Sequence, residues 1–204
     1  MLGMSLKKIN LRTAVLILMI VVAAVIRILS STRVLSPLAN FTPIGAMALF
    51  GGAYFKDKWK AYLVPLGILF LSDVITMRTI YTEQSTGLLY SGWGWIYASF
   101  ALMVLIGNYI KNVTVGSVLL AAIGAALVHW LVSDFGVWLV PGTDITTGQP
   151  YTRDAHGLMM CYWLAIPYMK NMLIGNVLYG ALLFGGFELL QKRYPRLQST
   201  IHPI

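Results

Sequence analysis

The sequence predicts an all-α fold, a polytopic membrane bundle of six transmembrane helices. Charged residues make up only 11% of the 204 residues and hydrophobic residues 58%, whereas a soluble domain carries about 25% charged residues. The apolar residues gather in blocks long enough to cross a bilayer. Basic residues flank these blocks, as they do at the cytoplasmic ends of membrane helices.

The first half of the chain predicts three spans. The block after Lys7 and Lys8 has an apolar run longer than that of a typical signal peptide, so we expect it to be retained as a helix. The second block is short but rich in glycine and alanine, which favour close helix contacts, so we expect a buried interior helix. Ser72 and Asp73 interrupt the third block near its far end. We place these spans at residues 11–29, 41–55 and 61–77.

The second half predicts three further spans. The fourth block opens with a cluster of tyrosine and tryptophan, which suits a membrane interface. The last apolar stretch is too long for one span, and Pro167 is expected to divide it because proline breaks helices. We therefore expect a short helix over 158–166, lying across the mouth of the bundle, before the final span. The three spans are placed at residues 88–110, 113–140 and 168–190.

Charge placement predicts the orientation of this single membrane domain, residues 1–204. If the N-terminus is cytoplasmic, the inside segments collect ten basic residues, and Arg33, Arg78, Arg153 and Lys170 stay on the outer side. This distribution agrees with the positive-inside rule. We therefore expect both termini in the cytoplasm and a multi-pass protein of the cell inner (plasma) membrane.

Composition and motifs exclude several functions. The net charge of +8 does not form a basic stripe interleaved with aromatics, so no nucleic-acid partner is expected. Attraction to an anionic lipid bilayer explains the charge more simply. The chain has no P-loop, GxSxG or HExxH motif, so we expect no enzyme and no cofactor. Cys161 is the single cysteine, which rules out an intrachain disulfide.

The polar residues of the predicted spans lie toward the outer side. Asp73 is near the outer end of the third span, His129 and Asp134 are in the later half of the fifth, Lys170 opens the last, and Asn40 precedes the second. An ionisable group in hydrocarbon costs about 3 kcal/mol or more, so each should face a wet cavity or a partner. A cavity open to the outside would satisfy all of them.

We therefore predict a ligand pocket with a few polar groups and aromatic walls. No catalytic residue is assigned, and no metal ligand, because His129, His156 and Cys161 do not make a ligand set of the usual spacing. The structural alternative is that Asp73 pairs with Lys170, and Asp134 with Arg153, inside the bundle. The predicted ligand-binding residues are Asn40, Asp73, His129, Asp134, Trp138, Cys161, Tyr162, Trp163 and Lys170.

Four segments carry a resemblance to a known group of proteins. They are residues 40–55 (NFTPIGAMALFGGAYF), Ser72-Asp73, residues 134–138 (DFGVW), and Cys161-Tyr162 with residues 165–168 (AIPY). Together they resemble small six-span bacterial membrane proteins of uncharacterised function. That group is similar to the S-components of energy-coupling-factor (ECF) vitamin transporters, including the cobalamin-binding type.

The resemblance implies a vitamin-like molecule bound near the outer face, and an ATP-driven partner module that topples the protein to release its cargo inside. Many S-components carry an Ala-xxx-Ala docking motif on the first span, and this first span has none. The leading hypothesis is a substrate-binding membrane transport protein, with an ECF-type energising module or another membrane complex as its partner. The alternative is an accessory or assembly subunit of a larger membrane complex, with no ligand of its own. A membrane enzyme that uses Asp73, His129 and Asp134 is the third hypothesis.

Overall fold

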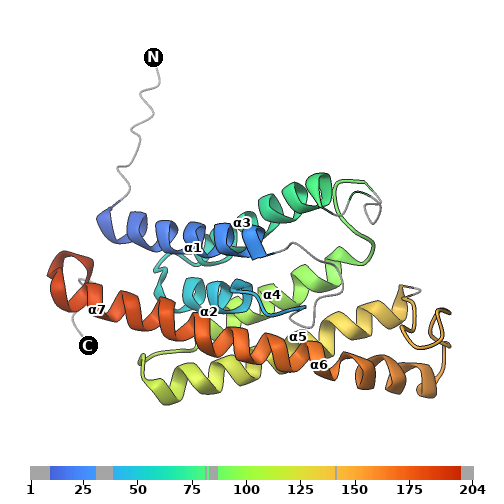
Figure 1. The fold of residues 1–204 in the computed structure, drawn as a ribbon. Coiled ribbons are helices and arrows are strands. Elements are labelled where there is room, and N and C mark those ends of the chain that lie inside the picture. The colour runs from blue at the N-terminus through green and yellow to red at the C-terminus, as the bar shows by residue number, and fades with distance from the viewer. Residues whose placement is uncertain (1–9, 31–38, 81, 83–86, 141, 199–204) are drawn as a thin grey trace.

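The computed structural model describes residues 10–30, 39–80, 82, 87–140 and 142–198, and these form an all-α bundle (Figure 1). The predicted all-α class is confirmed. A five-residue π-helix, η2, joins α6 to α7, so these elements form one uninterrupted helix. In chain order the helices are α1 (Leu11–Ser30), α2 (Ile44–Tyr54), α3 (Lys58–Thr79), α4 (Trp93–Asn108), α5 (Val115–Leu139), α6 (Ala155–Gly180), η2 (Ala181–Gly185), α7 (Gly186–Arg193) and the 3-10 turn η3 (Pro195–Leu197).

Four helices are long and apolar enough to cross a bilayer, which indicates an integral membrane protein. They are α1, α3, α5 and the continuous helix from Ala155 to Arg193. The helices α2 and α4 are apolar but shorter, with 11 and 16 residues. A helix of 11 residues is about 16 Å long, roughly half the thickness of a hydrocarbon core.

The short helix α2 lies at the centre of the bundle. It packs against α1, α3, α4 and α6, and nearly all of its residues are buried. In Figure 1, α1 and α3 lie on one side of it and α5 and α6 on the other. Glycines allow the closest approach: a Cβ atom at Gly52 would lie 2.2 Å from the carbonyl oxygen of Val104, and one at Gly107 would lie 2.3 Å from that of Leu49. The glycine-rich sequence of α2 thus forms the interior helix that its composition predicts.

The structure corrects the prediction that Pro167 divides the last apolar stretch. Pro167 lies inside α6, which runs from Ala155 to Gly180 without a break, so no separate helix lies across the mouth. The missing N–H of a proline leaves one helix carbonyl, here that of Trp163, without its usual donor. Transmembrane helices tolerate this where neighbouring helices supply donors. Here Trp130 of α5 donates to the adjacent carbonyl, that of Tyr162, over 3.1 Å.

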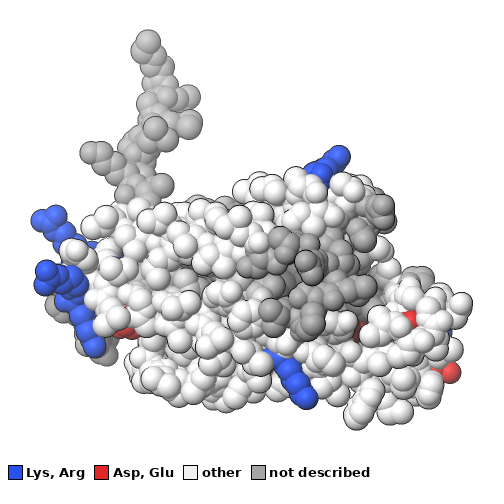
Figure 2. Space-filling model, in the orientation of Figure 1, with Lys and Arg blue, Asp and Glu red and all other residues white. Residues whose placement is uncertain are grey.

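The bundle has two distinct ends. At the terminal end, where α1 begins and α7 ends, Arg12 donates to Gln191 Oε1 (3.0 Å) and to the carbonyl of Leu197 (2.6 Å). At the loop end lie the connections α3–α4 and α5–α6. Basic side chains gather at the terminal end (Figure 2). In the described residues this end carries Arg12, Lys56, Lys58, Lys60, Lys111, Lys192, Arg193 and Arg196, against Arg78 and Arg153 at the loop end.

Candidate functional site

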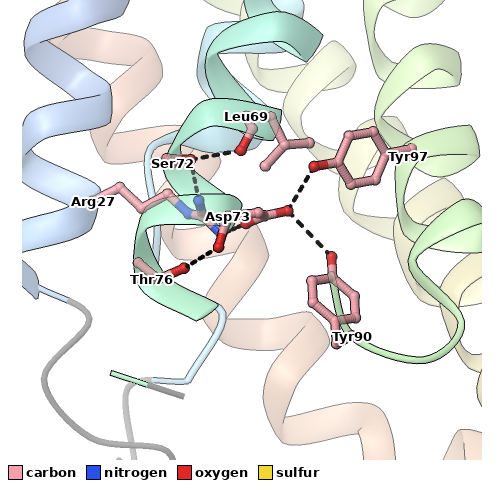
Figure 3. A network of polar contacts seen from close by, with 7 residues as sticks. All are labelled: Arg27, Leu69, Ser72, Asp73, Thr76, Tyr90 and Tyr97. Carbon is pink, nitrogen blue, oxygen red and sulfur yellow. Dashed lines mark hydrogen bonds and ion pairs between the residues drawn. The ribbon is translucent and has the colours of Figure 1, made fainter. Parts of the chain in front are cut away.

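Asp73 lies at the centre of a closed polar cluster that we call the Arg27–Asp73 clamp (Figure 3). Its carboxylate is 1% exposed and pairs with Arg27 of α1, with Nη2 and Oδ1 2.6 Å apart. Its other oxygen, Oδ2, accepts a hydrogen bond from the hydroxyl of Tyr97 (2.9 Å) and a longer one from Tyr90 (3.4 Å). Arg27 also donates to the Ser72 hydroxyl, which in turn donates to a backbone carbonyl. Both oxygens of Asp73 are therefore engaged within the protein.

The clamp corrects the expected partner of Asp73, which is Arg27 of α1 and not Lys170. Asp73 lies 15 residues after Lys58, about 22 Å along α3, in a helix that is long and apolar enough to cross a bilayer. A charge within such a helix needs a partner. The pair supplies one and fixes α1 to α3, so the clamp holds the bundle together.

A second cluster, the Asp134 site, lies between α5, α6 and the loop that joins them. It comprises His129, Ser133, Asp134, Tyr151 and Cys161. Ser133 and His129 are buried, and Ser133 donates to the His129 carbonyl (2.7 Å). The same Ser133 hydroxyl lies 3.4 Å from Oδ2 of Asp134, a longer and weaker contact than its bond to the His129 carbonyl. Asp134 is half-buried, so its carboxylate has acceptor capacity that these contacts do not use.

The other members of the Asp134 site come from α6 and the loop. Cys161 is buried and its Sγ lies 3.4 Å from the Asp134 carbonyl oxygen. Burial above all, and then the nearby groups Cys161, Asp144 and Asp134, raise the pKa of Tyr151 to about 12. Asp144 is held in the loop by hydrogen bonds from the Thr146 side chain and backbone (2.6 and 2.7 Å), which lower its pKa. The Tyr151 hydroxyl thus stays protonated at neutral pH and can donate a hydrogen bond.

Tyr151 is a site residue that the sequence analysis did not select. It lies in a long loop with no periodicity, and the sequence carries no signal that the loop folds back onto α5 and α6. The hydrogen bond from Tyr151 N–H to the Gly142 carbonyl (3.0 Å) closes the loop on itself, and Trp138 of α5 donates to the Thr152 carbonyl (2.9 Å) and so holds the loop against the helix.

The predicted aromatic residues occupy different places around the Asp134 site. Tyr162 packs on Trp130, with ring centroids 5.1 Å apart, and its hydroxyl donates to the Leu131 carbonyl (2.8 Å). Trp138 lies one turn beyond Asp134 and donates to the Thr152 carbonyl (2.9 Å), which closes the loop end. Trp163 is 67% exposed and lies on the outer face of α6.

The expected pairing of Asp134 with Arg153 is also corrected. Arg153 donates hydrogen bonds to the carbonyls of Trp138 and Leu139 at the C-terminus of α5, and each bond is 2.5 Å long. A guanidinium placed there satisfies helix carbonyls that have no partner within the helix. Asp134 is therefore not neutralised by Arg153.

Asn40 and Lys170 lie at a third place, where the chain enters α2. Asn40 is exposed and has a φ of 65°, a left-handed conformation that asparagine adopts more readily than most residues. Asn171 donates to the Ala39 carbonyl (2.8 Å), which fastens this entry to α6 next to the exposed Lys170. Eight of the nine predicted residues thus divide between the clamp, the α2 entry and the surroundings of Asp134, where His129, Trp138, Cys161 and Tyr162 join it. The ninth, Trp163, lies on the outer face of α6.

The surroundings of the two acidic groups differ. Asp73 is 1% exposed and paired with Arg27, whereas Asp134 is half-buried and lies five residues before the end of α5. Within the described residues, no group of three or more His, Cys, Asp and Glu is arranged to hold a metal ion. The arrangement can accept hydrogen bonds from, or balance the charge of, a small molecule that enters from the loop end.

Comparison with known proteins gives a family and no function. A model described as "Family of unknown function (DUF6580)" matches residues 7–197. No curated protein and no solved structure matches the chain.

Proposed function

We propose that this chain, which belongs to the DUF6580 family of unknown function, is a substrate-binding integral membrane transport protein for a small vitamin-like molecule. The Asp134 site binds the molecule near the outer face. The observation that carries the proposal is the Asp134 carboxylate: it is half-buried near the loop end of an apolar helix, and the Ser133 hydroxyl lies 3.4 Å from it. No basic residue in the described part of the chain forms an ion pair with it, and an ionisable group so placed is a functional-site candidate.

The orientation follows from charge. Of the twelve lysines and arginines in the described segments, eight lie at the terminal end, Arg78 and Arg153 lie at the loop end, and Arg27 and Lys170 lie within α1 and α6. Cytoplasmic segments carry the excess of lysine and arginine, so the terminal end faces the cytoplasm. The loop end, with the Asp134 site, faces outward, and a substrate reaches it from outside the cell.

The chemistry of the site defines the substrate class. Asp134 offers a carboxylate acceptor, the Tyr151 hydroxyl is a donor, and Tyr162 and Trp138 provide apolar surface nearby. Ligand pockets combine such apolar walls with a few oriented polar groups. The preferred substrate carries a cationic group or a hydrogen-bond donor that meets Asp134, beside a flat or apolar portion. The site is assigned to binding and not to catalysis.

The clamp has a separate role in this proposal. Asp73 does not contact the substrate, because Arg27 and Tyr97 use both of its oxygens. It is a positioning residue that holds α1, α3 and α4 in place behind the site. The similarity to ECF S-components extends the proposal to an ATP-driven membrane partner that completes transport.

The experiment is mass spectrometry of small molecules that remain with the protein after gentle detergent purification. Wild type and Asp57→Asn should retain the same compound, because Asp57 is a surface residue at the terminal end that pairs with Lys60. Asp134→Asn should lose it, since the amide keeps the shape of the side chain but removes its charge. Retention of the compound by Asp134→Asn would contradict the assignment of the site. An empty wild-type protein that co-purifies with stoichiometric partner chains would favour the accessory-subunit alternative.

A further inference from the structure

An apolar groove lies far from the Asp134 site, near the terminal end of the bundle. It forms between the start of α5 and the continuous wall of α6, η2 and α7, and its volume is about 480 Å³. Volumes of this size are typical of ligand sites. On the α5 side it is lined by Val115, Val118, Leu119 and Ala122, and on the other by Val177, Gly180, Ala181, Phe184 and Gly185.

The wall opposite α5 leaves space for the groove because it contains small residues and a π-helical turn. Gly180, Ala181 and Gly185 present little side-chain volume, and a Cβ atom at Gly185 would meet no other atom within 4 Å. π-helical turns occur often at functional sites, where they displace one face of a helix.

The length of the groove suits an acyl chain. The wall from Val177 to Glu188 is about 16 Å long, about half of a hydrocarbon core of about 30 Å and so close to the depth of one leaflet. A transmembrane helix has about 20 apolar residues and is about 30 Å long, so it would extend well beyond this lining. The groove therefore matches one hydrocarbon chain of a single leaflet.

Basic residues near the terminal end of the groove favour an occupant with an anionic group at that end. Lys111 lies two residues before Val113, which lines the groove, and Lys192 lies one turn beyond Glu188 on the same face of α7. Both lysines are exposed. α5 begins at Val115, four residues after Lys111, where Thr114 and Ser117 form a capping box, and the partial positive charge of the helix N-terminus adds to that of the lysine.

The groove is also lined by the acidic residue Glu188, whose carboxylate is hydrogen-bonded to other side chains of the protein. Its Oε1 accepts hydrogen bonds from the Tyr54 hydroxyl (2.5 Å) and from Gln191 Nε2 (3.0 Å). Its carboxylate thus belongs to the contacts between α2 and α7, and the two lysines set the sign of the charge at the opening.

We propose that this groove binds one acyl chain of an anionic phospholipid, whose phosphate lies between Lys111, Lys192 and the N-terminus of α5. The bound lipid fills the gap between α5 and the π-helix and ties the two walls together. The site is independent of the Asp134 site and of the transport proposal, because no residue is shared.

The test is native mass spectrometry of the detergent-purified full chain with dioleoyl phosphatidylglycerol and dioleoyl phosphatidylcholine as probes. Each basic residue near a membrane surface favours anionic lipid about fivefold. Wild type should therefore retain one phosphatidylglycerol with a preference of about tenfold or more over phosphatidylcholine. Lys111→Gln/Lys192→Gln should lower that preference to about twofold. The matched control, Lys56→Gln/Arg78→Gln, removes two charges away from the groove and should keep the wild-type preference.

A second variant fills the groove itself. Gly185→Leu should abolish retention of the lipid, because its side chain enters open space without a clash. Gly67→Leu is the control, since a Cβ at Gly67 also meets nothing within 4 Å but lies on α3. Retention by Gly185→Leu at the wild-type level would overturn the inference. So would equal retention of both lipids by wild type, or a second protein chain in place of the lipid.

Discussion

The Arg27–Asp73 clamp gives the sharpest prediction about stability. Asp73→Asn keeps the shape of the side chain but leaves the Arg27 charge, whose side chain is 16% exposed, without its 2.6 Å partner. Removing one member of a buried ion pair costs about 3–5 kcal/mol. For a chain of 150–250 residues, each kcal/mol lowers the melting temperature by about 2–4 °C. We therefore expect Asp73→Asn to lower the melting temperature by about 10 °C.

A double-mutant cycle isolates the pair. Arg27→Met/Asp73→Leu removes both charges and should recover at least half of the lost unfolding free energy, because apolar replacement of a buried pair is often near neutral. Unfolding by denaturing detergent in mixed micelles measures the free energies. Asp57→Asn is the control, since its exposed pair with Lys60 contributes about 0–1 kcal/mol. If Asp73→Asn unfolds like wild type yet no longer retains the small molecule, Asp73 contacts substrate and the clamp assignment is wrong.

Three further predictions test the packing, the loop end and the orientation. Gly107→Ala should destabilise the protein by about 1–3 kcal/mol because its Cβ would lie 2.3 Å from a backbone oxygen of α2, whereas Gly67→Ala should be neutral in the same unfolding assay. Asp154 caps α6, and the hydrogen bond from the Gly157 N–H lowers the pKa of its carboxyl group. The ionised carboxylate therefore stabilises the folded state above about pH 4, the pKa of an unfolded aspartate, and this stabilisation is lost as the pH falls through the lower pKa of the folded state. Thermal unfolding should thus separate Asp154→Ala from wild type at pH 7, and the difference should shrink in acid. In a cysteine-free background, a membrane-impermeant maleimide should label Thr146→Cys but not Lys56→Cys in intact cells; the reverse pattern would invert the topology.

The helices were predictable from the sequence because membrane helices are specified by composition. Blocks of apolar residues mark where α1, α3 and α5 lie, and the glycine and alanine of residues 44–54 mark α2 as the interior helix. Pro167 led to a wrong prediction because a helix can continue through a proline when contacts with a neighbouring helix stabilise it. α5 provides these contacts for α6: Trp130 and Tyr162 each donate a hydrogen bond to a carbonyl of the other helix.

The partners of the polar residues were not predictable in this way. Asp73 and Arg27 are 46 residues apart, and no pattern in the sequence states which basic residue faces a given carboxylate. The same limit explains the expected pair of Asp134 with Arg153, since only the structure shows the guanidinium on the carbonyls at the end of α5. Tyr151 was missed because loops carry no periodicity from which a side-chain direction can be inferred.

The most direct test of the account is thermal unfolding of the purified protein against a panel of water-soluble vitamins and their precursors. A ligand at about 100 times its dissociation constant stabilises the folded state by about 2.7 kcal/mol. For a chain of this length that corresponds to a rise of about 5–10 °C. We predict that at least one compound produces this rise with wild type and Asp57→Asn, and none with Asp134→Asn. An equal rise with Asp134→Asn, or no rise with any compound, would contradict the central claim.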